Sequence, residues 1–334
     1  MCRLLMSTTT NSADLGVYRV DAPLGDRLSS LYLFVGRERS VLFDSGIDGT
    51  IPTYLIPFAR ELGLPLSHIE LVVISHCDVD HFGGIGDVHD YLPAARVVAH
   101  ELDADAMENF DAFERDRGRS FRLAYGYDEG PDEWSRSVVR EGWVDRRLTG
   151  DEQIDLGDRV VEIIHLPGHS RGHLAVLDPE HGTLAIGDAI LGDAVPLASG
   201  APAFPPTYRF ERSYLQSIER VRDLDVASIV TAHYGSFTGP EATRFLNVSR
   251  DFALDLRARV LTAVRDARPG VGLEELARRL NPEVGSWPKH TSMAALVSPI
   301  AAHLEQLESE GLIRRDRDDS SFAVFHSGET FDKA

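Results

Sequence analysis

The chain has 334 residues, of which 43% are hydrophobic and 26% are charged, and this balance excludes a disordered, collagen-like or coiled-coil protein. Its 53 acidic and 34 basic residues give a formal net charge of −19, a surface that repels nucleic-acid phosphates and anionic lipid. Two cysteines cannot form a disulfide framework, and no apolar run is long enough for a signal peptide or a membrane span. We therefore expect a cytoplasmic protein that acts on a small-molecule substrate, with neither a membrane nor nucleic acid as its partner.

Short strands and helices alternate in the first 100 residues. Apolar runs predict strands at 30–35, 40–43 and 71–74, and helical spacing that ends near Gly63 and Pro65 predicts a helix over 50–62. Later apolar runs predict strands at 160–164, 174–177, 184–186 and 228–230. An acidic residue or a histidine follows these later strands closely, and side chains at strand ends converge in open α/β sheets. The pattern therefore indicates a site at one edge of a sheet.

Two irregular segments interrupt this alternation. Residues 109–143 are polar and arginine-rich but contain seven aromatic residues, and residues 192–210 are rich in Pro, Ala and Gly. Long irregular segments in compact domains often serve as lids or binding loops. A helical flap that buries its aromatic residues in its own small core explains residues 109–143 equally well. On the binding interpretation, Trp134, Phe204 and Tyr208 contact the substrate.

The region after residue 240 predicts helices at 254–267, 273–280 and 294–311, followed by a hairpin from 312–315 and 322–325. This order is that of a winged helix. Its third helix carries Glu305, Glu308 and Glu310, which favours a packing or dimer module over a DNA reader. We predict a catalytic domain over 1–245, with 109–143 as a lid-like insertion, and a winged-helix-like accessory domain over 246–334, through which a homodimer could form.

A cluster of metal-binding side chains follows the strand predicted at 71–74. His76, Asp78, Asp80 and His81 fall within six residues, and alternation along an extended segment points the first three the same way. Carboxylates and imidazoles packed this closely would repel each other or stay unsatisfied without a cation. The cluster therefore predicts a divalent metal site. Alternation turns Cys77 away from the metals, so we expect it to be a small buried apolar residue.

The segment from His76 to His81 resembles the HxHxDH signature of the metallo-β-lactamase superfamily, with Asp78 in place of the second histidine. Four further motifs resemble the family's in its order: LFDSG at 42–46, PGHSRGH at 167–173, GD at 187–188 and AH at 232–233. The resemblance covers roughly residues 15–240 and points to HxDxDH members of the glyoxalase II-like branch. It implies a mixed α/β (α+β) fold, an αββα sandwich with two metals on its upper edge, ahead of the small helical C-terminal domain.

Carried over position by position, the resemblance implies two ligand sets that share one carboxylate. The first metal would be bound by His76, Asp78 and His169, the second by Asp80, His81 and His233, and Asp188 would bridge them. Asp44 would orient a ligand histidine, as such carboxylates commonly do. His173 is assigned a structural role. Asp80 is also the candidate catalytic residue, because it would orient the attacking water or take up its proton.

The resemblance implies a dinuclear hydrolase that uses a metal-bridging hydroxide to cleave an ester, lactone or thioester of a small, partly apolar substrate. The cofactors would be two divalent ions, with zinc first, and Asp78 adds a negative oxygen ligand that suits manganese or iron. That residue also leaves open a diiron oxidoreductase on the same fold. A metal-dependent nuclease is disfavoured by the acidic surface, and a non-enzymatic regulator by the intact ligand set.

Overall fold

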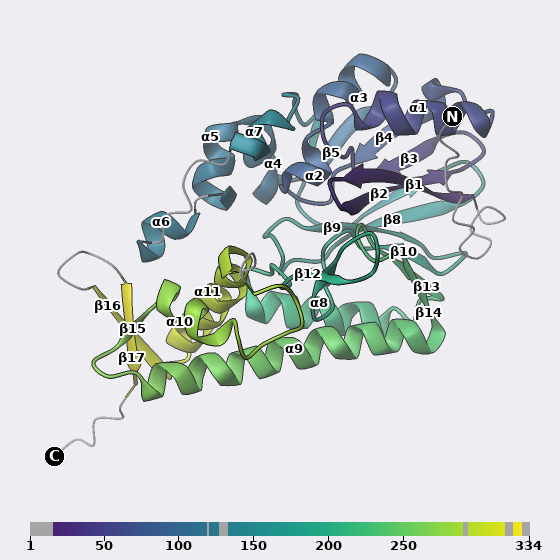
Figure 1. Cartoon of the computed structure of the whole chain (residues 1–334). Helices are drawn as coiled ribbons and strands as arrows, with labels where there is room; N and C mark the ends of the chain where they lie inside the picture. Colours follow the sequence, from purple (N-terminus) through teal and green to yellow (C-terminus); the bar gives the residue numbers. More distant parts are fainter. Residues whose placement is uncertain (1–15, 119, 127–132, 290–292, 318–322, 329–334) are drawn as a thin grey trace.

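The computed structural model describes residues 16–118, 120–126, 133–289, 293–317 and 323–328, and two six-stranded sheets form its centre (Figure 1). The first sheet has the order β1 (Val17–Leu24), β2 (Arg27–Val35), β3 (Ser40–Phe43), β4 (Ile69–Val73), β5 (Arg96–His100), β6 (Arg146–Leu148). The second has the order β14 (Ser236–Thr238), β13 (Ser228–Val230), β10 (Thr183–Ala185), β9 (Leu174–Asp178), β8 (Val160–His165), β7 (Glu152–Asp155). The smaller sheets pair β11 (Val195–Pro196) with β12 (Pro202–Phe204), and β15 (Val271–Gly272) and β16 (Ile313–Arg317) with β17 (Ala323–Ser327).

Helices cover both outer faces of the sandwich and continue into the C-terminal region (Figure 1). In the first half they are η2 (Ile51–Leu55), α1 (Ile56–Glu61), η3 (Leu66–His68), α2 (Val79–Phe82), α3 (Ile85–Tyr91) and α4 (Glu101–Glu108). The segment between β5 and β6 continues with α5 (Phe110–Phe113), η4 (Glu114–Gly118), α6 (Ser120–Tyr125) and α7 (Glu133–Ser137). The second half has α8 (Glu211–Asp223), α9 (Gly239–Asp266), α10 (Leu273–Leu280) and α11 (Met293–Ser309).

Alternating side chains build the four layers. In β2, Leu31 and Leu33 face the cluster beneath the helices of the first half, whereas Tyr32 and Phe34 enter the cluster between the two sheets. The second sheet repeats this pattern, with Val176 facing the first sheet and its neighbours facing α8 and α9. Three apolar clusters thus separate helix, sheet, sheet and helix. The αββα sandwich predicted from the sequence is confirmed.

The parallel strand pairs bring the site segments to one edge. Phe43 at the end of β3 pairs with Val73 at the end of β4, and Ala185 at the end of β10 pairs with Val230 at the end of β13. Because parallel strands end on the same side, the residues that follow these four strands meet there.

The C-terminal region differs from the sequence prediction in its first helix. We predicted a helix over 254–267, but α9 begins at Gly239 and is continuous for 28 residues. Its first turns bury Phe245 and Leu246 in the cluster against the second sheet, which extends the helix upstream. The predicted domain boundary at 245/246 falls inside α9, and the two-domain division stays a prediction. The strand predicted over 322–325 matches β17 from Ala323 onward, and Phe322 lies outside the described residues.

The acidic side chains of α11 are used within the chain. Glu305 pairs with Arg209, and Tyr125 donates a hydrogen bond to the same carboxylate. Glu308 also pairs with Arg315, and Glu310, which directly follows α11, pairs with Arg257. This agrees with the packing role predicted for the third helix. The homodimer stays a prediction.

The insertion between β5 and β6 joins two apolar cores. Phe113 packs in the first-half cluster, whereas Phe121 and Tyr125 pack in the cluster formed by α9, α10 and α11. These aromatic residues therefore do not form a core of their own, contrary to the alternative of a self-contained flap. The insertion instead spans from the sandwich to the C-terminal helices (Figure 1).

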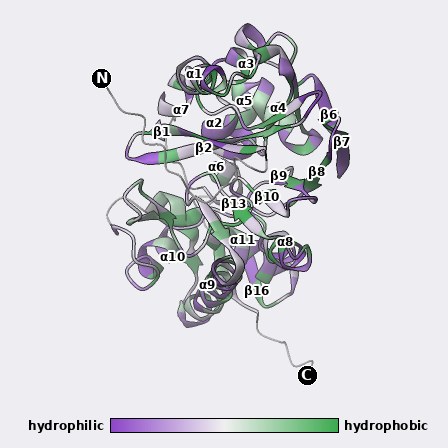
Figure 2. Ribbon diagram, turned by 90° about the vertical axis from the view of Figure 1, so that its right-hand side faces the viewer, coloured by the Kyte–Doolittle hydropathy of each residue, from purple (hydrophilic) through white to green (hydrophobic). Residues whose placement is uncertain are grey.

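Hydrophobic residues line the central strands and α11, and β7 at the sandwich edge is largely hydrophilic (Figure 2). Among the described residues, none of the helices combines the length and apolar character that a membrane span requires.

Glu305 of α11 contacts both Tyr125 of the insertion and Arg209 in the loop that precedes α8. These contacts predict an acid-sensitive link among the three segments. Burial would raise the pKa of Glu305, but hydrogen bonds and the charge of Arg209 outweigh it and hold that pKa below its ordinary value. A lowered folded-state pKa stabilises the fold above the unfolded-state pKa, and this contribution is lost as the pH falls through the folded-state pKa. Glu305→Gln should therefore lower stability at pH 7 by on the order of 1 kcal/mol and change it much less at pH 3.

Thermal melts of the wild type and Glu305→Gln between pH 7 and pH 3 test this link. The exposed carboxylate of Glu274 on α10 provides the control, Glu274→Gln. A Tm difference between the wild type and Glu305→Gln that stays constant across this range contradicts the prediction.

Candidate metal centre

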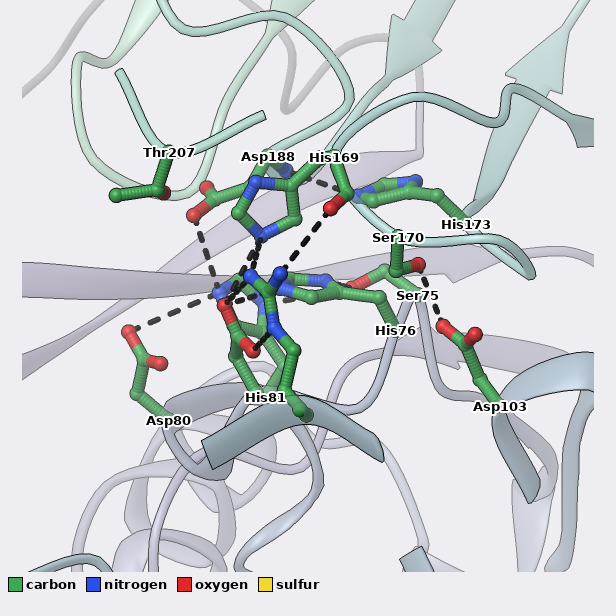
Figure 3. A network of polar contacts seen from close by, with 12 residues as sticks. Ser75, His76, Asp80, His81, Asp103, His169, Ser170, His173, Asp188 and Thr207 are labelled. Carbon is green, nitrogen blue, oxygen red and sulfur yellow. Dashed lines mark hydrogen bonds and ion pairs between the residues drawn. The ribbon is translucent and has the colours of Figure 1, made fainter. Parts of the chain in front are cut away.

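Segments that follow strands of both sheets supply the seven candidate ligands, which converge at one edge of the sandwich. Figure 3 labels five of them: His76, Asp80, His81, His169 and Asp188. His76 and Asp78 follow β4, while Asp80 and His81 belong to the short helix α2. His169 lies in the loop between β8 and β9, Asp188 follows β10, and His233 follows β13. The structure therefore brings together all the ligands proposed from the motifs, although they lie up to 157 positions apart in the sequence.

The first ligand set is His76, Asp78 and His169. Asp78 Oδ2 lies 2.9 Å from His169 Nε2 and 3.4 Å from His76 Nε2. The three ligand atoms lie within 4.8 Å of one another. This spacing allows one cation to contact all three.

The second ligand set is Asp80, His81 and His233, whose ligand atoms also lie within 4.8 Å of one another. Asp80 Oδ2 is 3.7 Å from His81 Nε2 and 3.5 Å from His233 Nε2. His233 Nδ1 donates to the carbonyl oxygen of Leu28 at 2.7 Å, so its Nε2 is the ring nitrogen that faces the carboxylates.

Asp188 lies between the two sets. It forms a third group with His76 and His81, again within 4.8 Å. Its Oδ2 is 3.7 Å from His81 Nε2 and 3.2 Å from His233 Nε2. One carboxylate therefore adjoins ligands of both sets, which is the placement a bridging role requires.

Asp44 and His173 belong to neither ligand set, but each contacts a candidate ligand. Asp44 Oδ2 is 2.8 Å from His81 Nδ1, and its Oδ1 accepts the backbone N–H of Ser75 at 2.7 Å. Asp44 adopts a φ of 69°, a left-handed conformation that a residue other than glycine seldom takes. His173 Nε2 accepts the backbone N–H of Asp188 at 3.2 Å, which fits the structural role assigned to it.

The donor set fits divalent cations. The buried atoms without a hydrogen-bond partner in the described part of the chain include Nε2 of His76, Nε2 of His81 and Oδ1 of Asp188. A buried polar atom without a partner costs roughly 1–3 kcal/mol, so each of these atoms favours a cation. Burial, together with the charges of His81 and His169, lowers the pKa of His76 well below its ordinary value, which favours the neutral form that binds metals. His/Asp clusters that could hold a metal are therefore present.

Arg117 is a site residue that the motif analysis did not select. Its Nε and Nη2 donate to Asp78 Oδ1 and Oδ2 at 2.5 and 2.6 Å. Its Nη2 also lies 3.0 Å from His169 Nε2. Burial would raise the pKa of Asp78, but the charge and hydrogen bonds of Arg117 outweigh it and hold that pKa well below its ordinary value.

Asp103 on α4 is a second residue that the sequence analysis missed. Its carboxylate accepts the Ser170 hydroxyl at 2.5 Å (Figure 3). It also accepts the backbone N–H of Gly172 at 2.9 Å. It thereby anchors the loop that carries His169. Nothing in the local sequence distinguishes Asp103 from the other acidic residues of its helix, so only the fold reveals this contact.

A cavity of about 270 Å³ opens over the two ligand sets. The sandwich, the insertion and α11 all contribute to its wall, which comprises Arg27, Asp78, Asp80, Arg117, Gly118, Phe121, Asp188, Phe204, Thr207, His233, Ala294, Ala295 and Ser298. Apolar and cationic groups therefore lie close to the ligands.

Of the three aromatic residues predicted to contact substrate, only Phe204 is among the residues that line this cavity. Phe204 lines the cavity, and the Arg27 guanidinium lies 5.0 Å from its ring centroid. Tyr208 is fully buried and stacks on Tyr214, and half-exposed Trp134 is not among the lining residues, so neither ring reaches the cavity. Cys77 is buried in the first-half apolar cluster, as predicted.

A family model described as the metallo-beta-lactamase superfamily matches residues 24–233. A Drosophila melanogaster protein named beta-lactamase-like protein 2 homolog is 23% identical over 303 residues, which cover 89% of this chain and 88% of the relative. The human acyl-coenzyme A thioesterase MBLAC2 is 25% identical over 233 residues, and the match covers 63% of this chain and 74% of that protein. The Caenorhabditis elegans beta-lactamase-like protein 2 homolog is 23% identical, covering 61% of this chain and 55% of that protein, so the chain spans about half the length of this relative.

Solved structures share the fold. The metallo-beta-lactamase family protein TTHA1429 of Thermus thermophilus superposes with a TM-score of 0.70 at 22% identity, covering 94% of this chain and 99% of that chain. A beta-lactamase domain protein of Burkholderia ambifaria gives a TM-score of 0.68 at 18% identity, and the match covers 94% of this chain and 91% of that chain. At these identities the similarity is one of fold, and it extends beyond the sandwich into the C-terminal helices.

Proposed function

This chain belongs to the metallo-β-lactamase superfamily, and we propose that it is a metal-dependent hydrolase of a small, partly apolar ester, lactone or thioester. The observation that carries the proposal is the pair of ligand sets adjoining Asp188 beneath a single cavity. His76, Asp78 and His169 would hold one divalent cation. Asp80, His81 and His233 would hold the other.

The bound cations would supply an acidified water as nucleophile and a Lewis acid for the developing oxyanion. Asp80 faces the cavity with its side chain 14% exposed, so its carboxylate can orient a water or accept its proton. Asp44 and Ser75 fix the ring orientations of His81 and His76 through their Nδ1 atoms. The donor geometry therefore exists before substrate arrives.

The cavity wall favours an acyl substrate with an apolar part. Phe121 and Phe204 offer aromatic surface, and Thr207 offers a hydroxyl close to Asp188 (Figure 3). Arg27 adds a cation at the same wall, which suits an anionic group on the part of the substrate away from the bond that is cleaved. The thioesterase name of the human relative supports placing thioesters first among the three carbonyl classes.

The test is hydrolysis by protein that has been stripped of metal and reloaded with zinc, manganese or iron(II). Acyl-coenzyme A thioesters, lactones and aryl esters of increasing acyl length are compared by initial rates. The proposal expects metal-dependent turnover of at least one carbonyl class, with kcat/KM rising with acyl length. Absence of turnover in all classes with every metal overturns it.

Asp78 keeps a second candidate open, a diiron oxidoreductase on the same fold. An added carboxylate favours iron or manganese over zinc. The same preparations distinguish the two candidates. Two iron per chain with a redox-sensitive absorption band, together with no hydrolysis, favours the oxidative candidate.

A further inference from the structure

The guanidinium of Arg117 and a cation in the first ligand set require the same atoms. Arg117 Nη2 contacts Asp78 Oδ2 and His169 Nε2, which are two of the three ligand atoms of that set. The guanidinium N–H groups occupy the space in front of these two atoms, and a metal bound by both atoms would need that same space. We propose that Arg117 is an internal competitor for the first metal, so that the second set fills first and the first set fills only when Arg117 is displaced.

The charges of the cluster support this competition. Asp78, Asp80 and Asp188 bring three negative charges, which one divalent cation and the single charge of Arg117 balance. A second divalent cation would leave two excess positive charges if the guanidinium stayed. Like charges held this close in a buried cluster repel strongly, so binding of the second cation and departure of Arg117 are linked.

The second ligand set has no such competitor. In the part of the chain that the structure describes, His81 Nε2 has no hydrogen-bond partner, while its Nδ1 is held by Asp44. His233 Nε2 adjoins only the carboxylates of Asp80 and Asp188 in the ion pairs of this centre. A cation can therefore enter this set without displacing a side chain.

A second cavity next to Arg117 could receive its displaced guanidinium. Arg117 lines this cavity of about 470 Å³ together with the carboxylates of Asp103, Asp116 and Glu305. The same wall also carries Arg115, Arg171 and Arg209, two of which pair with Asp116 and Glu305, so this cavity offers the released guanidinium room beside carboxylates that are shared with other arginines. Because Arg117 lies on η4 of the insertion, its displacement would couple the first metal to the position of this segment over the cavity.

This inference rests on metal binding by the proposed hydrolase, and zinc binding tests it without any activity assay. Metal-free wild type, Arg117→Gln and Arg115→Gln are dialysed against buffered free zinc over several decades of concentration, and bound zinc is measured by elemental analysis. Arg115 provides the control because it lies on the same η4 segment, is exposed and pairs with Asp116. Circular dichroism and thermal melts verify folding.

The wild type should bind one zinc tightly and the second at free-zinc concentrations at least tenfold higher. Arg117→Gln should lower the free zinc needed for the second equivalent at least tenfold, and Arg115→Gln should follow the wild type. Two equally tight sites in the wild type, or an unchanged second site in Arg117→Gln, overturns the competition while leaving the hydrolase proposal intact. A wild type that binds no zinc overturns both.

Hydrogen exchange on the wild type keeps the test decisive if Arg117→Gln does not fold. Backbone exchange in residues 114–118 is followed as zinc is added. The competition predicts little change with the first equivalent and faster exchange with the second, because the segment loses its contacts with Asp78 and His169. Unchanged exchange on binding the second equivalent contradicts the proposal.

Discussion

Replacing Asp188 with alanine is expected to remove at least one metal equivalent per chain and to lower kcat/KM for hydrolysis at least about a hundredfold. Loss of a residue that only orients a ligand typically costs 10–100-fold in affinity or activity, and Asp188 itself adjoins both ligand sets. The measurement is elemental analysis beside initial rates on the best substrate. Asp188→Ala also removes one of the two carboxylates that His81 and His233 share, the other being Asp80, so both cations should be held more weakly.

Asp193→Ala is the matched control, because Asp193 is an exposed carboxylate five residues further along the same segment. It should retain the metal content and activity of the wild type. Two metal equivalents and full activity in Asp188→Ala would contradict the bridging assignment.

Gly168→Ala is expected to lower the free energy of unfolding by roughly 3 kcal/mol or more and to weaken metal binding. Gly168 has a φ of +146°, and a Cβ there would lie 2.4 Å from Tyr214 Cα and 2.7 Å from Tyr214 N. Those are backbone atoms of α8, which cannot move aside as a flexible side chain can. Strain at this position is transmitted directly to His169, the next residue and a candidate ligand.

Denaturant unfolding and zinc titration measure the two effects. Gly150→Ala is the control, because no atom lies within 4 Å of the Cβ position there. It should change stability by less than about 0.5 kcal/mol. Equal stability and equal zinc affinity in the two variants would show that the approach of Gly168 to Tyr214 does not fix the loop.

The ligands could be predicted from the sequence because the chemistry is concentrated in short motifs at strand ends. His76 to His81 form one continuous segment, and His169, Asp188 and His233 each close a recognisable motif. The strand periodicity placed those motifs at the edge of a sheet, and the αββα order then followed from the resemblance.

Arg117 and Asp103 could not be found in this way. Arg117 lies 39 positions after Asp78, in a segment with several other arginines, and only the path of the insertion selects it. Tyr208 shows the converse error, because an aromatic residue in a loop near the site turned out to stack inward on Tyr214. Contacts between elements distant in sequence depend on packing, which local patterns do not encode.

The central claim is that metal bound at these two ligand sets is required for carbonyl hydrolysis. The most direct test measures metal equivalents and hydrolysis rate together, as chelator-stripped protein is reloaded in steps. We expect no turnover without metal and turnover that rises with bound metal, up to two equivalents per chain. Full activity in the stripped protein, or no metal bound after reloading, would contradict it.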